Sequence, residues 1–308
     1  MSYNVAILMS TYNGMDYLRE QIESIRSQTY KQWNLYIRDD GSSDNTIDLI
    51  KTFVHQDARI HFINADNQVN RGVKRSFLNL LSSVKADFYM FCDQDDYWLP
   101  NKVKLTLDAM ISDYHNKPRL VFTNMNLVDS NLKVLEKASL SAVNISYWTS
   151  KDQLMFDNIV TGCTVMINNQ LKQYVFPISA KKIVMHDWYI AQLASQLGDI
   201  QYVTDPTILY RQHESNQVGV NKSLFGKVKK LARFNDFQTA VILQISQGRL
   251  TQKKSQVVFS KTTQAFLNWN FTCPLILKVL PIIQNNFKKH TWPGTIALNL
   301  ALLRRKKS

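Results

Sequence analysis

The sequence predicts a doubly wound α/β domain with a mostly parallel sheet, followed by a basic and mainly helical C-terminal region. Through the first 125 residues, short apolar runs alternate with longer amphipathic stretches, which is the pattern of strands joined by helices. The charge then changes sharply. Residues 1–220 hold 21 Lys/Arg and 23 Asp/Glu, whereas residues 221–308 hold 16 Lys/Arg and one acid, Asp236. We therefore place a domain boundary near residue 220.

The elements of the first domain follow from the spacing of its apolar residues. The expected strands cover residues 5–9, 35–37, 60–63 and 88–92, and the expected helices carry apolar faces at 17–25, 47–53 and 77–84. Ser42 or Ser43 is placed to cap the second helix. The last strand is apolar throughout, as expected when helices cover both faces of a sheet. Since such sheets bind ligands at the carboxyl ends of strands, the polar residues that follow the strands are candidates for a functional site.

Three carboxylates stand within four residues directly after the last of these strands: Asp93, Asp95 and Asp96. Like charges this close repel one another unless a cation lies among them. Carboxylate oxygens suit Mg²⁺ or Mn²⁺, which bridge to substrate phosphates. The structural alternative is a solvated turn that caps the next helix, but a cap needs one acid rather than three. Asp39 and Asp40 end the second strand, where they could bind a nucleotide or simply form a turn.

Several features disfavour other classes of protein. No G-x-G-x-x-G follows the first strand and no G-x-x-x-x-G-K-[ST] occurs, which disfavours dinucleotide oxidoreductases and P-loop NTPases. The cysteines Cys92, Cys163 and Cys273 form no CxxC pair, so neither a disulfide framework nor a zinc knuckle is expected. No secretory signal and no uninterrupted apolar run of membrane-spanning length is visible. We therefore expect a cytoplasmic protein.

Three segments, in this order and at these separations, strongly resemble the motifs of the family-2 glycosyltransferases, which have the GT-A fold. They are VAILMSTYNG at residues 5–14, IRDDGSSDNT at residues 37–46 and FCDQDDYWLPNKV at residues 91–103. The third resembles the D-x-D metal segment of the family in a D-x-D-D form. The resemblance covers residues 3–215, roughly, and implies a nucleotide-binding part at 1–125 and an acceptor part at 126–220.

The resemblance also implies which residues bind the donor. The residues expected to bind a nucleotide sugar are Thr11, Tyr12, Asn13, Asp39, Asp40, Asn70, Lys74, Arg75, Asp93, Asp95, Arg211 and His213. Asp40 would bind the base, while Asp95 or Asp96 would hold Mn²⁺ or Mg²⁺ on the diphosphate. The sequence does not separate these two acids. For Lys74 and Arg75, the solvated face of a helix is the alternative.

A second set of residues is implied for the acceptor side. Asp187, in the segment MHDWY, matches the catalytic base of the family, although an acid at a helix start also interacts with the helix dipole. Gly162, Cys163, His186 and Trp188 are expected near the acceptor. The segment YRQH at 210–213 resembles a motif of bacterial rhamnosyltransferases, in which Arg211 and His213 would neutralise the leaving diphosphate. Together with HDW, it favours dTDP-L-rhamnose as the donor.

The basic region predicts helices whose other faces carry Lys and Arg. Its closing Arg304–Lys307 follows the apolar run 296–303, a pattern typical of a segment that lies on an anionic membrane surface. Leu298, Leu302 and Leu303 would then insert into the membrane. The alternatives are helices packed on the catalytic domain, or a homo-oligomer, with solvated lysines.

The sequence therefore predicts an inverting, metal-dependent glycosyltransferase, peripheral on the inner face of the cell membrane, that transfers L-rhamnose to a hydroxyl of a lipid-linked polysaccharide precursor. A UDP-sugar donor is the alternative within the same fold. A nucleic-acid-binding protein using the basic tail would leave the three-acid turn unexplained, so no nucleic-acid partner is expected. A nucleotidyltransferase would need a Gly-rich basic loop near the N-terminus, and a scaffold without activity would not need the intact acids.

Overall fold

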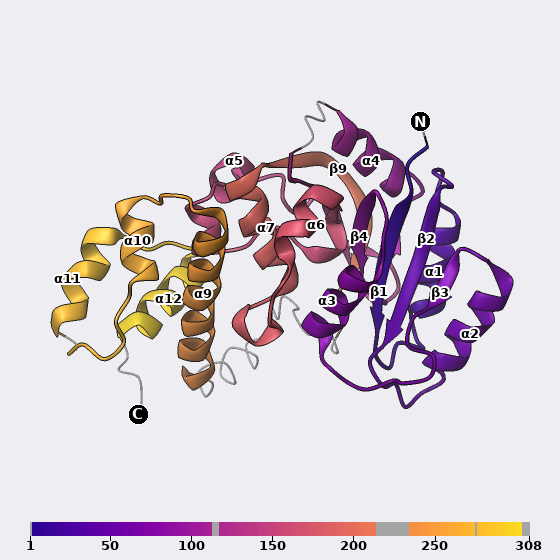
Figure 1. Cartoon of the computed structure of the whole chain (residues 1–308), viewed down its shortest axis with the longest axis horizontal. Helices are drawn as coiled ribbons and strands as arrows, with labels where there is room; N and C mark the ends of the chain where they lie inside the picture. Colours follow the sequence, from indigo (N-terminus) through magenta and orange to yellow (C-terminus); the bar gives the residue numbers. More distant parts are fainter. Residues whose placement is uncertain (1, 113–116, 214–233, 275, 304–308) are drawn as a thin grey trace.

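The computed structural model describes residues 2–112, 117–213, 234–274 and 276–303. A nine-stranded sheet runs through the part of the chain up to residue 211. Helices cover both faces of this sheet, and the C-terminal helices form a group beside it (Figure 1). This arrangement confirms the predicted α/β class with a helical C-terminal region.

The first half of the sheet is built from strands joined by helices. Its elements are β1 (Val5–Thr11), α1 (Leu18–Arg26), β2 (Trp33–Asp39), α2 (Thr46–Gln56), β3 (Ile60–Phe62), α3 (Val73–Ser83), β4 (Phe88–Cys92), β5 (Tyr97–Trp98) and α4 (Lys102–Ile111). The predicted strands and helices are confirmed within a few residues. The predicted cap is wrong: Asn45 precedes α2, and the Ser42 hydroxyl instead donates to Asp39.

The second half completes the sheet and adds the C-terminal helices. Its elements are β6 (Arg119–Val128), β7 (Val134–Glu136), α5 (Ile145–Trp148), β8 (Val165–Asn168), α6 (Asn169–Val175), α7 (His186–Leu197), β9 (Asp199–Arg211), α9 (Phe234–Ser255), α10 (Lys261–Leu267), α11 (Ile276–Asn285) and α12 (Trp292–Leu303), with 3₁₀ turns at Gln153–Met155, Gly162–Thr164 and Ala180–Lys182.

The strand order creates a crevice beside β1. The order is β3-β2-β1-β4-β8-β6-β9-β5, with β7 paired to β6. β3, β2, β1 and β4 run parallel, whereas β8 is antiparallel to both β4 and β6. The chain moves outward from β1 to β3 and then returns to place β4 on the other side of β1. Because the loops after β1 and β4 therefore diverge, a ligand can bind between them.

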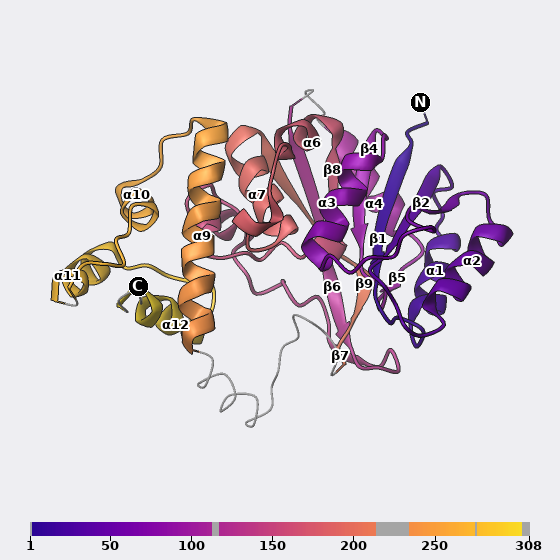
Figure 2. The same cartoon turned by 60° about the horizontal axis from the view of Figure 1, so that its bottom comes forward.

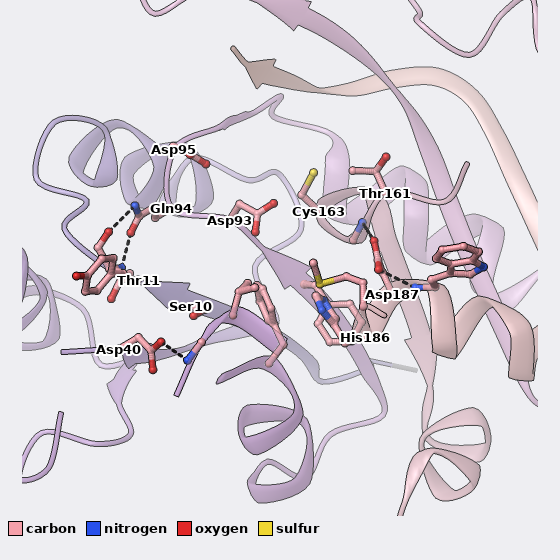
Figure 3. Close-up of a pocket in the computed structure, with 18 of the residues that line it drawn as sticks. Ser10, Thr11, Asp40, Asp93, Gln94, Asp95, Thr161, Cys163, His186 and Asp187 are labelled. Carbon is pink, nitrogen blue, oxygen red and sulfur yellow. Dashed lines mark hydrogen bonds between the residues drawn. The ribbon is translucent and has the colours of Figure 1, made fainter. Parts of the chain in front are cut away.

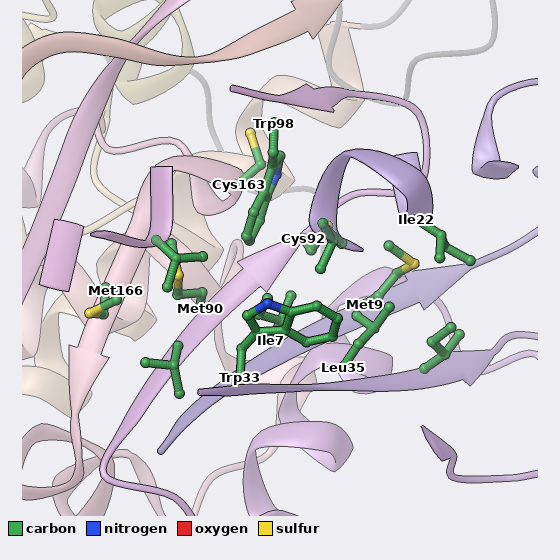
Figure 4. Close-up of a cluster of buried hydrophobic side chains, with 14 of the residues drawn as sticks. Ile7, Met9, Ile22, Trp33, Leu35, Met90, Cys92, Trp98, Cys163 and Met166 are labelled. Carbon is green, nitrogen blue, oxygen red and sulfur yellow. The ribbon is translucent and has the colours of Figure 1, made fainter. Parts of the chain in front are cut away.

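Alternate side chains of the strands supply two separate cores. Val5, Ile7 and Met9 of β1 pack with α1, α2 and α4, whereas Ala6 and Leu8 pack with α3, α6 and α7. This division follows from the two-residue repeat of a strand. Figure 4 shows the first of these cores, in which apolar residues of β1 and β2 lie together. Helices on both faces thus fix the strand ends that carry the polar loops.

The C-terminal helices pack on the α/β part through a third core. Met155 and Phe156, from the segment before β8, join Phe266, Phe287 and Leu302 in this core. The Gln244 side chain of α9 donates to the carbonyls of Met155 and Phe156, and α9 lies beside α7 (Figure 2). The α/β part and the C-terminal helices therefore share one packed interface.

This packing overturns one expectation about the membrane. Leu298 and Leu302, which were expected to insert into a bilayer, are buried in the third core. The predicted boundary at residue 220 and the basic stretch Arg304–Lys307 lie outside the described residues. In the described part of the chain, no helix combines the length and the apolar character needed to cross a membrane.

Candidate functional site

A cavity of about 770 Å³ opens at the crevice between β1 and β4. Its walls come from the ends of these two strands, the loop before α3, the segment 157–163, the start of α7 and the end of β9. This volume is within the range of ligand-binding sites in proteins. Figure 3 shows Asp40, Asp93 and Asp187 around the cavity, with Asp93 between the other two in this view.

Most of the site residues predicted from the sequence line this cavity. They are Thr11, Tyr12, Asn13, Asp40, Asn70, Asp93, Asp95, Gly162, Cys163, His186, Asp187, Trp188 and His213. Positions up to about 200 residues apart in the sequence are thus brought together. The other predicted residues, Asp39, Lys74, Arg75, Asp96 and Arg211, are not part of its lining.

Asp40 organises the end of the cavity that adjoins α3. Its Oδ1 accepts from Arg38 Nη1 at 2.6 Å and from the Arg71 backbone N–H at 2.7 Å, and its Oδ2 accepts from the Gly72 N–H at 2.7 Å. Burial alone would raise the pKa of Asp40, but the hydrogen bonds from Arg71, Arg38 and Gly72 lower it below its usual value. Asp40 is therefore ionised at neutral pH and ties the loop before α3 to the end of β2.

Asp39, the neighbour of Asp40 in the sequence, has a structural role. Its carboxylate accepts from the backbone N–H groups of Gly41 and Ser42 and from the hydroxyls of Thr11 and Ser42. Gly41 has a φ of +85°, a conformation that favours glycine. Asp39 thus holds the turn after β2 against β1 and has no exposed surface for a ligand.

The acids after β4 divide into two groups. Asp93 and Asp95 line the cavity, while Asp96 is buried beneath them. Burial, followed by the negative charges of Asp95 and Asp187, raises the pKa of Asp93 to about 7. Burial and the charges of Asp95 and Asp93 also raise the pKa of Asp96. Among the residues described here, Asp96 Oδ2 has no hydrogen-bond partner.

This carboxylate group fits a hard divalent cation. His213 Nε2 lies 2.9 Å from Asp95 Oδ2, so an imidazole and two carboxylates are available at the cavity wall. A cation would also relieve the repulsion that raises the pKa values of Asp93 and Asp96. Ligand atoms of Asp93, Asp96 and Cys163 lie within 4.8 Å of one another. Burial raises the pKa of the Cys163 thiol, however, and a protonated thiol is a poor ligand for Mg²⁺ or Mn²⁺.

Arg211 lies behind the acids, although it was expected at the diphosphate. Its backbone N–H donates to Asp96 Oδ1 at 3.1 Å, its Nε donates to the Asp95 carbonyl at 2.8 Å, and its Nη2 donates to Glu20 at 2.6 Å. The guanidinium also lies 4.5 Å from the centre of the Tyr17 ring. Arg211 thus fixes the acidic turn from outside the cavity.

The two cations of α3 are also placed differently from the expectation. Lys74 Nζ donates to the Ile183 carbonyl at 2.9 Å, which ties α3 to the segment before α7. Arg75 is exposed on α3 and is not part of the cavity wall. The solvated helix face, the alternative raised from the sequence, describes Arg75.

Asp187 lies at the end of the cavity opposite Asp40, in the first turn of α7. Its Oδ1 accepts from the Trp188 N–H at 2.7 Å and its Oδ2 accepts from the Gly162 N–H at 3.1 Å. Burial raises the pKa of Asp187 to about 6, although these two hydrogen bonds oppose the increase. The side chain is therefore held in one orientation, ionised at neutral pH and more basic than an ordinary aspartate.

His186 lies next to Asp187 in an apolar setting. Its ring stacks on Phe77 at 4.4 Å between centroids and meets the Phe91 ring at 4.9 Å. The side chain is 4% exposed and lines the cavity, yet neither ring nitrogen has a hydrogen-bond partner in the described parts of the chain. Burial lowers the pKa of His186 to about 3, so the ring is neutral. A ligand hydroxyl could supply the missing partner.

Two residues at this site were missed from the sequence. Lys102 is fully buried behind the acidic turn, where its Nζ lies 3.2 Å from the Thr207 hydroxyl. Burial lowers its pKa to about 8, and the charge of Asp96 opposes this effect. The Gln94 side chain bonds both backbone groups of Tyr12 and so joins the loops after β1 and β4. Both residues lie in the segment FCDQDDYWLPNKV, which was the available signal.

Two curated proteins resemble much of the chain. It is 32% identical over 236 residues to the dTDP-rhamnosyl transferase RfbG of Shigella flexneri, an alignment that covers 72% of this chain and 78% of that protein. It is 25% identical over 190 residues to the UDP-Glc:alpha-D-GlcNAc-diphosphoundecaprenol beta-1,3-glucosyltransferase WfgD of Escherichia coli, with 61% and 68% covered.

Two solved structures share the fold. TarS 1–349 of S. aureus in complex with UDP-GlcNAc has a TM-score of 0.56 at 15% identity and covers 96% of this chain and 79% of TarS. The mannosyltransferase PcManGT of Pyrobaculum calidifontis in complex with GDP-Man and Mn²⁺ has a TM-score of 0.56 at 12% identity, with 100% and 89% covered. At these identities the likeness concerns the fold alone, which is GT-A.

The family itself is established by a match that runs from β1 to β8. Residues 6–167, more than half of the chain, match the model of glycosyl transferase family 2. This range contains the three motifs noted in the sequence, apart from Val5, and the cavity acids Asp40, Asp93 and Asp95. The chain therefore belongs to glycosyl transferase family 2 and is a glycosyltransferase.

Proposed function

We propose that the protein transfers L-rhamnose from dTDP-L-rhamnose to a hydroxyl of a lipid-linked polysaccharide precursor, with inversion at the anomeric carbon. The observation that carries the choice of sugar is the 32% identity to a protein named as a dTDP-rhamnosyl transferase. The YRQH segment at 210–213 supports the same choice. A UDP-sugar donor is the second candidate, because WfgD is named as using UDP-Glc and TarS holds UDP-GlcNAc.

The cavity offers a place for each part of the donor. The base would lie near Asp40, whose Oδ2 takes one hydrogen bond from the protein and can accept another from a base N–H. The diphosphate would lie at Asp93, Asp95 and His213. The sugar would then occupy the space between these residues and Asp187, over the rings of Phe77, Phe91 and His186, all of which line the cavity.

We propose Asp95, with Asp93 and His213, as the residues that hold Mn²⁺ or Mg²⁺. Asp95 is favoured over Asp96 because Asp95 lines the cavity, whereas Asp96 is buried and its Oδ1 accepts from the Arg211 N–H. The Mn²⁺ in the PcManGT complex supports a metal in this fold. When bound, the cation would offset the charge that develops on the leaving diphosphate.

Asp187 is proposed as the general base. Its carboxylate would take the proton of the acceptor hydroxyl while that oxygen attacks the anomeric carbon from the side opposite the diphosphate. The N–H groups of Gly162 and Trp188 hold the carboxylate in place. Little conformational entropy is therefore lost when Asp187 reaches the reactive geometry. An oxocarbenium-like transition state is expected, as in glycoside hydrolysis.

With this acceptor, we propose that the protein is peripheral on the inner face of the cell membrane. The name of WfgD includes a diphosphoundecaprenol acceptor, which supports a lipid-linked substrate. The net charge of +15 in residues 221–308 supports attraction to an anionic surface.

A donor-binding experiment tests the sugar. The thermal unfolding midpoint is measured with dTDP-L-rhamnose, dTDP alone, UDP-glucose and UDP-N-acetylglucosamine, each with and without Mn²⁺. We expect dTDP-L-rhamnose with Mn²⁺ to raise the midpoint most, since ligands that bind the folded state stabilise it. Stabilisation by the UDP-sugars alone would reject rhamnose and retain the family.

A further inference from the structure

The outer face of α11 is apolar, the reverse of an ordinary surface helix. Leu277, Val279, Leu280 and Ile283, which we call the α11 face, are each between 42% and 69% exposed. At 100° per residue they share one half of the helix circumference with Gln284. Figures 1 and 2 both place α11 at the outer end of the C-terminal helices. Exposed apolar patches of this kind mark interaction surfaces.

The inner side of the same helix carries its charge. Lys278 is 2% exposed, and its Nζ donates to the Phe271 carbonyl at 2.9 Å. Ile282, also on the inner side, packs against the third core. Burying Lys278 while leaving the four aliphatic side chains of the α11 face in solvent is unfavourable on both counts, so the outward orientation indicates a partner surface that covers them.

Positive charge near the α11 face favours an anionic membrane over a second copy of the chain as its partner. Residues 237–303 contain seven Lys/Arg and no Asp or Glu. Lys288 is exposed three residues beyond α11, and Trp292, which is 78% exposed, begins α12. Two copies joined through this face would bring the exposed Lys288 of each copy together, and residues 237–303 supply no acid to pair them. An anionic bilayer instead offers negative charge for the cations and an apolar layer for the aliphatic and indole side chains.

We infer that the α11 face docks the protein on an anionic membrane, with Leu277, Leu280 and Ile283 in the outer part of the acyl layer. This inference rests on the proposed function for its biological sense, because a lipid-linked acceptor lies in the membrane. In this arrangement the residues of the α11 face reach the bilayer, rather than Leu298 and Leu302, which are buried.

Vesicle binding by the full chain tests the inference. Sedimentation with vesicles of phosphatidylglycerol and phosphatidylcholine is compared with sedimentation with phosphatidylcholine alone. Wild type should bind the anionic vesicles preferentially. Leu280→Asp with Ile283→Asp should weaken the partition coefficient by about tenfold or more, and Leu280→Gln with Ile283→Gln, which adds no charge, by less. Val258→Asp is the matched control, because Val258 is 84% exposed outside α11 and should not alter binding.

Two further measurements distinguish a failure of the membrane inference from a failure of the proposed function. All variants should keep the thermal shift produced by the nucleotide donor, so a failed membrane result leaves the donor assignment standing, and a failed donor result leaves the vesicle result standing. Amide exchange of α11 in the wild type should slow when anionic vesicles are added, which needs no substitution. Equal binding by wild type and the Asp variant, or no binding to either vesicle, would overturn the inference. A wild-type dimer that the Asp variant dissociates would show instead that the α11 face joins two copies.

Discussion

Replacing Asp187 with asparagine should make the protein more stable and far less active. The substitution keeps the size of the side chain, and the amide oxygen can still accept a hydrogen bond from Gly162 or Trp188. It removes the carboxylate that would take the proton. We expect turnover to fall by about 10²- to 10⁴-fold, the usual contribution of a general base, with donor affinity nearly unchanged.

The gain in stability follows from the pKa of Asp187. Burial raises this pKa from 3.8 to about 6. Two pKa units correspond to about 3 kcal/mol at neutral pH. Since the carboxylate faces a cavity that water can enter, we expect Asp187→Asn to raise the free energy of unfolding by about 1–2 kcal/mol at pH 7.5. Activity and stability would thus change in opposite directions, as is common where a charge is held in an active site.

The pH dependence of the free energy of unfolding tests whether the charge of Asp187 destabilises the fold. The folded chain binds the Asp187 proton more tightly than the unfolded chain, so the charge lowers stability above about pH 6 and has no effect below about pH 4. The advantage of Asp187→Asn in urea unfolding should therefore shrink between pH 6 and pH 4. The wild-type kcat/KM should rise with pH through about 6 as the base ionises.

Asp108→Asn is the control for this experiment. Asp108 is an exposed acid on α4, where it pairs with Lys104, and its loss should change neither turnover nor stability appreciably. Turnover of Asp187→Asn within about threefold of wild type would refute the assignment of the base. A loss of stability in this variant at pH 7.5 would refute the argument from burial.

Three other predictions concern the metal, the neutral histidine and the buried arginine. EDTA should abolish turnover, and Asp95→Asn should raise the Mn²⁺ concentration for half-maximal activity by about tenfold or more, whereas full activity in EDTA would exclude a metal. His186→Phe should keep the packing on Phe77 and Phe91. It should raise the KM for a sugar substrate by about 5- to 20-fold, which corresponds to the loss of one hydrogen bond. An unchanged KM would mean that the ring nitrogens of His186 contact no substrate. Arg211→Ala should lower the free energy of unfolding in urea by about 2–4 kcal/mol, because it removes a buried side chain and its bonds to the Asp95 carbonyl and Glu20. Weaker donor binding without a loss of stability would contradict this role.

The first half of the fold could be predicted because its signals are local. The apolar run at 5–9 and the helical spacing at 17–25 determine β1 and α1 without help from distant residues. The cavity residues Asp40, Asp93 and Asp187 were found by the motifs that contain them. A motif gives the position of a residue along the chain, and strand ends then bring such positions to one edge of the sheet.

The direction of a side chain could not be predicted in this way. Asp95 and Asp96 are neighbours, yet one faces the cavity and the other is buried against the Arg211 N–H, which lies 115 residues later in the sequence. The motif at 210–213 likewise located Arg211 but not the face to which it turns. On α11 the sequence shows one lysine among apolar residues, and only the packed structure shows that Lys278 points inward.

The most direct test of the account is sugar transfer by the purified full chain. Labelled dTDP-L-rhamnose and Mn²⁺ are added to membranes that carry polyprenyl-diphosphate-linked precursors, and both the dTDP released and the label in extracted lipid are measured. We predict that dTDP and labelled lipid form in equal amounts with the wild type, and that Asp187→Asn forms neither at more than about a hundredth of that rate. If the wild type leaves dTDP-L-rhamnose intact and consumes only UDP-sugars, rhamnosyl transfer is wrong. If it consumes no nucleotide sugar at all, the assignment of this cavity as a site of glycosyl transfer is contradicted.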